Sequence, residues 1–68
     1  MTYHVKARGY PSDHVTASNH KAAAKRYVNS NGVASTTVLV EGAGVAIRFS
    51  VASNGRLNEI SRYSTGPR

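Results

Sequence analysis

The chain has no cysteine, no tryptophan and few acidic residues. Without cysteine it can form neither a disulfide scaffold nor a zinc module with cysteine ligands. No apolar run approaches the roughly 18 residues that a membrane span needs. No apolar stretch follows a basic N-terminal segment, so we expect no signal peptide. These absences predict a small, soluble, intracellular protein that does not act on membranes.

The chain of 68 residues is long enough for one small domain and no second one. We expect a single domain over residues 1–63 and a flexible tail over residues 64–68. A domain of this size buries only about 60% of the surface of its unfolded chain, and it has little spare structure for a deep catalytic cleft. The length therefore favours a binding protein over an enzyme.

Positive charge is the main compositional signal. Nine Lys and Arg stand against three Asp and Glu, which gives a formal net charge of +6. Such a surface attracts polyanions, so nucleic acid, or a protein that handles nucleic acid, is the first candidate partner. The alternative is that the charge only keeps a small domain in solution. The residues that we expect to contact a partner are basic side chains spread along the chain: Lys6, Arg8, Lys21, Lys25, Arg26, Arg48, Arg56 and Arg62.

The N-terminal half predicts two strands and a helix. Apolar and polar residues alternate over residues 3–8, as in a half-buried strand. Residues 9–13 have turn chemistry, and residues 14–17 form a short returning strand. Ser18 is a suitable N-cap for an alanine-rich helix over residues 19–30, which Asn31 and Gly32 end. Its buried side should carry Ala23, Ala24, Tyr27 and Val28.

The C-terminal half predicts three further strands. Residues 35–41 are β-branched, and residues 45–51 alternate well. Asn54-Gly55 indicates a tight hairpin into a last strand over residues 56–63. Leu57 and Ile60 break the alternation of that strand, which predicts a bulge or an edge strand. The fold class is therefore α+β: an antiparallel sheet of about five strands with one helix on one face, in the order β-β-α-β-β-β, and the other face wet.

No arrangement of residues indicates catalysis or cofactor binding. The glycines of Gly42-Ala43-Gly44 resemble the start of a dinucleotide fingerprint, but a strand follows them instead of the required helix. The three histidines have no metal-ligand spacing, and the few carboxylates form no evident pair. We expect no enzymatic activity, no metal, no cofactor and no small-molecule substrate.

Two basic sets are candidates for the contact surface. The helix presents Lys21, Lys25 and Arg26 with no acid one turn away to neutralise them. The strands should turn Lys6, Arg8 and Arg48 outward, on the side away from the helix, with Arg56 or Arg62 as a further candidate. Among the aromatic residues, Tyr3 and Tyr27 are expected in the core or at its edge. Tyr10 and Tyr63 should be freer, and could stack on bases.

The whole pattern resembles the small anti-CRISPR proteins of phages, in particular the inhibitors of type I-F systems. The resemblance lies in Thr16-Ala17-Ser18 before the helix, the step Ala24-Lys25-Arg26 within it, and the three strands that follow. It implies a protein that works in the cytoplasm of a bacterial host, docks on the Cas subunits of a CRISPR surveillance complex and interferes with binding of the target DNA.

Two other readings of the sequence stay open. The same charge fits a phage accessory protein that binds nucleic acid directly and without sequence specificity. A third reading is a structural module, monomeric or paired through an edge strand, in which the β-branched segment 36–40 forms the contact.

Overall fold

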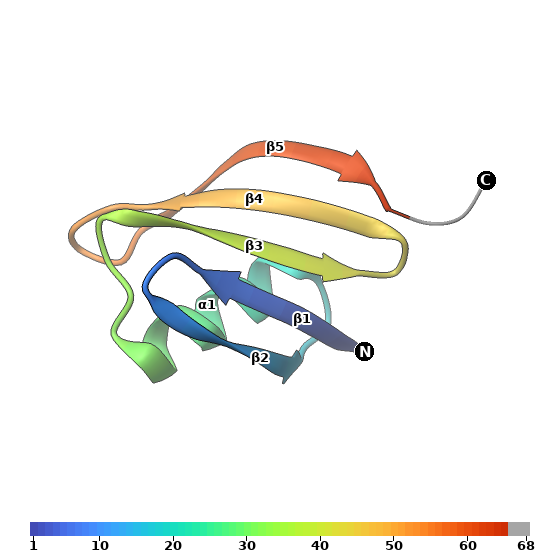
Figure 1. The fold of residues 1–68 in the computed structure, drawn as a ribbon, viewed down its shortest axis with the longest axis horizontal. Coiled ribbons are helices and arrows are strands. Elements are labelled where there is room, and N and C mark those ends of the chain that lie inside the picture. Colours follow the sequence, from blue (N-terminus) through green and yellow to red (C-terminus); the bar gives the residue numbers. More distant parts are fainter. Residues whose placement is uncertain (66–68) are drawn as a thin grey trace.

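The computed structural model describes residues 1–65 of the chain, and it contains five strands and one helix. All neighbouring strands are antiparallel, and their order across the sheet is β2-β1-β3-β4-β5 (Figure 1). This confirms the predicted α+β class and the predicted order of elements. The elements are β1 (Thr2–Ala7), β2 (Tyr10–Thr16), α1 (His20–Asn31), β3 (Thr36–Gly42), β4 (Val45–Val51) and β5 (Leu57–Ser64).

The core lies between α1 and one face of the sheet. The helix buries Ala23, Ala24, Tyr27 and Val28, as predicted. The two alanines are fully buried, and their small side chains let the helix lie close to the strands. The sheet contributes alternate, mostly β-branched or aromatic residues from three strands: Tyr3, Val5, Val38, Val40, Ile47, Phe49 and Val51.

The ends of the helix follow capping chemistry. Asn19, not Ser18, is the N-cap, and its side-chain oxygen accepts a hydrogen bond of 2.8 Å from the backbone N–H of Ala22. The prediction was wrong by one position because Ser and Asn are equally good N-caps and stand side by side here. Gly32 ends the helix in the left-handed conformation, with φ of 64°, as predicted.

The second strand is longer than predicted. It begins at Tyr10, which pairs with Ala7, so the segment expected to form a turn is part of the sheet. Pro11 is tolerated there because β2 is an edge strand and needs ladder hydrogen bonds on one side only. Tyr10, expected to be free, packs half-buried against the core.

The last hairpin joins β4 to β5 at the predicted place. The N–H of Gly55 donates to the carbonyl of Ala52 at 2.9 Å, and the positive φ of the turn falls on Gly55, at 86°. The ladder shifts register between Arg48 and Phe49 and leaves Ile60 without a partner. Strand β5 is therefore both an edge strand and a bulged one, as the broken alternation indicated.

The C-terminal end of β5 stays attached to the sheet. The strand runs to Ser64, and the N–H of Thr65 donates to the carbonyl of Gly44 at 2.8 Å. The first two residues of the predicted tail are thus joined to the β3–β4 turn. The rest of that tail, residues 66–68, lies outside the described residues.

Strand β3 occupies the centre of the sheet, hydrogen-bonded to β1 on one side and β4 on the other. Segment 36–40, proposed from the sequence as a dimer-forming edge, is therefore not an edge, and that expectation was wrong. The edges are β2 and β5. The single helix found within residues 1–65 has 12 residues, which is too short to cross a membrane.

Candidate nucleic-acid interface

Within residues 1–65, no helix or further strand covers one side of the sheet. We call this side the open face; the viewer looks onto it in Figure 1, with α1 behind the strands. Because side chains alternate along a strand, residues opposite each other on neighbouring strands share a face. Lys6 pairs with Leu39, and Leu39 pairs with Arg48, so these three form a row across β1, β3 and β4. The open face therefore carries cations at its middle.

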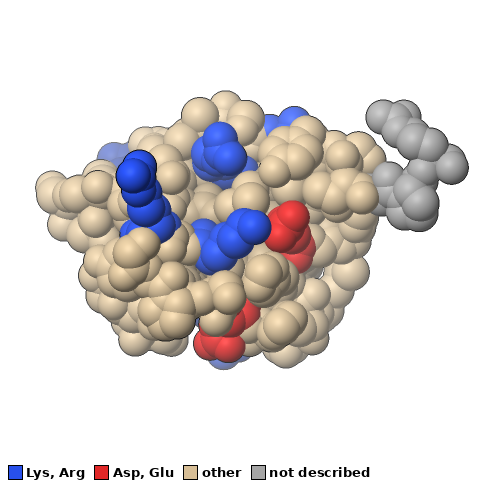
Figure 2. All heavy atoms as spheres, in the orientation of Figure 1, with Lys and Arg blue, Asp and Glu red and all other residues tan. Residues whose placement is uncertain are grey.

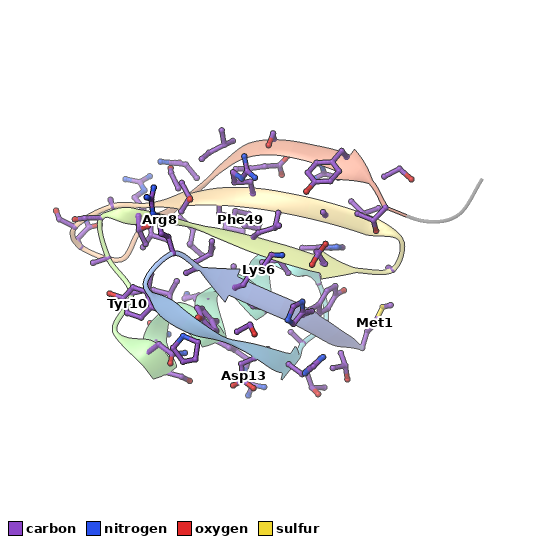
Figure 3. All side chains as sticks on the ribbon, viewed as in Figure 1. Met1, Lys6, Arg8, Tyr10, Asp13 and Phe49 are labelled. Carbon is purple, nitrogen blue, oxygen red and sulfur yellow. The ribbon has the colours of Figure 1, made fainter. Side chains whose placement is uncertain are left out.

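A shallow hollow of about 410 Å³ lies at this row. Lys6, Arg8 and Arg48 surround it, and half-buried Leu39 contributes its apolar lining. Figure 2 shows Lys and Arg side chains gathered on this face, with acidic atoms beside them. In Figure 3, Lys6 comes from β1 and Arg8 from the turn after it, both on the near side of the sheet. The sequence predicted that these three side chains point away from the helix, and the structure places all three around one hollow.

The charge of this hollow is only partly balanced. Glu41 lies beside it, with its Oε1 4.0 Å from Nζ of Lys6 and 3.4 Å from Nδ1 of His4. A partly exposed pair at such a distance contributes little, because water still reaches and screens it. Within residues 1–65, the side chains of Arg8 and Arg48 form no ion pair. Their guanidinium groups are free to pair with phosphate oxygens, which their planar geometry suits.

A second row on the open face carries rings. His14 pairs with His4, His4 with Glu41, Glu41 with Ala46, and Ala46 with Tyr63. The rings of His4 and His14 lie with their centroids 5.1 Å apart. Sequence reasoning did not assign the histidines to the interface. The signal was the alternation that places His4 on the same side of β1 as Lys6.

The remaining predicted cations lie elsewhere. Lys21, Lys25 and Arg56 line a groove of about 320 Å³ between α1 and the start of β5, which we call the helix-side groove. Because α1 covers the opposite side of the sheet from Lys6, the two basic surfaces face different directions. The helix and strand cations that the sequence singled out therefore lie on two separate surfaces.

Two predicted cations are engaged within the protein. The Nη1 of Arg26 donates to the backbone carbonyl of Thr16 at 2.9 Å, which ties α1 to the end of β2. Arg62 forms two hydrogen bonds to the carboxylate of Glu59, at 2.8 and 3.0 Å. This pairing lowers the pKa of Glu59 and raises that of Arg62. Neither arginine was recognisable as engaged from the sequence, because the contact of Arg26 spans 10 residues and that of Arg62 needs the bulged strand.

Comparisons with known proteins found no relative from which a function could be inferred. No family model matches the chain, and no curated protein and no solved structure matches it significantly. Over residues 1–65, the fold brings together no group of three or more side chains of the kinds that hold a metal ion.

Proposed function

We propose that this protein is a non-enzymatic binding protein that takes a nucleic acid on the open face of its sheet. The observation that carries the proposal is the convergence of Lys6, Arg8 and Arg48 on one hollow, where, among the described residues, Lys6 alone of the three lies within 4.0 Å of a carboxylate, that of Glu41. Cations that converge on a polyanion release its bound counterions, which drives binding without reading the sequence of bases. The protein would act in the cytoplasm of a bacterial host, as the resemblance to phage proteins implies.

The test is the salt dependence of binding to a labelled oligonucleotide, followed by fluorescence anisotropy. Contacts from three cations predict that log K falls against log salt with a slope of about −2 to −3. The double variant Lys6→Gln/Arg48→Gln should flatten the slope and weaken binding. Arg62→Gln is the matched control, because Arg62 is already paired with Glu59, and it should bind like the parent. An absence of binding at low salt would reject the proposal.

A second candidate function is inhibition of a CRISPR surveillance complex by docking on its Cas subunits. The helix-side groove favours it, because a second basic surface, turned away from the open face, leaves the protein able to contact a protein and a nucleic acid at once. Pull-down of Cas subunits from cells that carry such complexes tests it. Lys21→Glu/Lys25→Glu should abolish recovery, and Arg62→Gln should preserve it. Recovery that survives the double reversal would argue against docking through this groove.

A further inference from the structure

The geometry points to single-stranded nucleic acid, not duplex, as the ligand of the open face, with Tyr63 as the residue on which a base stacks. This inference rests on the proposed function and names its substrate class. Duplex DNA is read by an element narrow enough to enter a groove, such as a helix or a two-stranded ribbon. The open face is instead the broad side of a five-stranded sheet with a shallow hollow. Such a surface suits bases that are already unstacked.

Tyr63 provides the stacking surface. The residue is 48% exposed, one of few large hydrophobic residues so exposed in the described chain. It pairs with Ala46 across the β4–β5 ladder, so it stands on the open face beside a small side chain. An aromatic ring in this setting offers a flat partner to any base, since every base has a π-face. A buried structural tyrosine would not have this access.

The other end of the same row carries a second aromatic surface. His14 lies on β2, at the opposite edge of the sheet from Tyr63, and its ring lies near that of His4. From β2 to β5 there are four strand-to-strand steps, which span roughly 19 Å at about 4.8 Å each. A sheet of similar width in RNA-recognition domains stacks two or three bases. The open face is therefore wide enough for a short single strand that crosses the strands.

The two rows divide the work between bases and phosphates. The row of Lys6, Leu39 and Arg48 carries the cations, next to the row that ends at Tyr63. Glu41 lies in the middle of the aromatic row, where it would repel a phosphate. Its carboxylate accepts hydrogen bonds, as from the exocyclic amino group of cytosine. A strand whose bases lie over the row of Glu41 and Tyr63 can stack and form hydrogen bonds there. Its phosphates then lie over the row of Lys6 and Arg48, where they meet the cations.

The experiment compares a labelled single-stranded 12-mer with its duplex, for the parent, Tyr63→Ala and Tyr63→Phe, by fluorescence anisotropy at low salt. We expect the parent to bind the single strand more tightly. Tyr63→Ala should weaken that binding about 5- to 150-fold, the loss of one stacked base, while its duplex binding stays unchanged. Tyr63→Phe keeps the ring and should bind like the parent. Circular dichroism checks that each variant is folded. We expect folded variants because Tyr63 is exposed and its ring is not part of the core.

The possible failures are distinguishable. Equal or tighter binding of the duplex, or a Tyr63→Ala variant that binds the single strand like the parent, would overturn the assignment of a single strand and leave the proposed function standing. No binding of either oligonucleotide would overturn both.

Discussion

Gly42 of β3 lies directly against the ring of Tyr3 of β1: a Cβ atom at position 42 would overlap Cδ2 of that ring. The ring is buried and packs edge-on against His20 at the start of α1, with 4.6 Å between centroids. The Nε2 of His20 lies 3.0 Å from the backbone oxygens of both Gly42 and Val45. One contact region thus joins the helix to the first strand and to the β3–β4 turn.

The close approach predicts that Gly42→Ala destabilises the fold. The added methyl group must displace a buried ring that His20 holds on its other side, and overpacking of this kind costs about 1–3 kcal/mol. The free energy of unfolding from urea titration measures the loss. Thr37→Val, an exposed change in the same strand that keeps the side-chain shape, should stay within about 0.5 kcal/mol of the parent. Equal stability of Gly42→Ala and the parent would contradict the contact.

The turn between β3 and β4 predicts a stabilising substitution. Ala43 and Gly44 both have positive φ, of 54° and 75°, between the paired residues Gly42 and Val45. This is the signature of the two-residue turn that favours Asn-Gly, and a non-glycine residue such as alanine is strained there by about 1–2 kcal/mol. Ala43→Asn should therefore raise the melting temperature by several degrees. Ala52→Asn, in the other turn and without positive φ, is the control, and an equal gain there would contradict the explanation.

The hydroxyl of Tyr27 predicts a loss on removal. It donates to the backbone carbonyl of Pro11, and it joins the centre of α1 to the edge strand β2. Tyr27→Phe should cost about 1 kcal/mol of unfolding free energy, because the ring stays packed and only the hydrogen bond is lost. Burial, then Asp13 and Tyr10, raises the pKa of Tyr27.

That raised pKa has a defined sign for stability. As pH rises, Tyr27 ionises in the unfolded chain before it does so in the folded protein. Its contribution to the free energy of unfolding is therefore complete below its ordinary pKa of 10.0, and it is lost as pH rises through the higher pKa of the folded state. Stability measured from neutral to strongly alkaline pH should fall less steeply in Tyr27→Phe than in the parent. Parallel curves would contradict the assignment.

The ion pair on β5 predicts a pKa change without a large stability change. The hydrogen bonds from Arg62 lower the pKa of Glu59, so the pair's contribution is present above the ordinary carboxyl pKa and is lost as pH falls through the lowered one. In Arg62→Gln, the pKa of Glu59 should return toward its ordinary value, as followed by NMR titration of the carboxyl carbon. The melting temperature at neutral pH should hardly change, because the pair is exposed. An unchanged pKa would show that the pair does not persist in solution.

Local patterns were sufficient for most of the fold. The strict alternation over residues 45–51 predicted β4 to the residue, and the spacing of alanines predicted the buried side of α1. The prediction of a turn at residues 10–13 was wrong. Proline, serine and aspartate favour turns, and these residues form a strand only because they pair with β1. That pairing is tertiary, so no local pattern contains it.

The candidate site divides in the same way. Alternation placed Lys6 and Arg48 on the outward side of their strands, but their proximity depends on the pairing of β1 with β3. The engagement of Arg26 depends likewise on how α1 docks beside β2. Strand order is set by contacts between distant parts of the chain, so the sequence named the cations without showing which ones are neighbours.

Strand β5 is held to the sheet mainly by its backbone hydrogen bonds to β4. Leu57 alone of its residues packs against the core, and its other side chains are exposed. Local unfolding should begin there, and the amide hydrogens of β5 should exchange with solvent well before those of β1 and β3. Release of β5 bares the neighbouring edge of β4 and carries Tyr63 away from the sheet. The strand expected to open first thus also holds the proposed stacking ring, so a ligand bound to Tyr63 should slow hydrogen exchange along this strand.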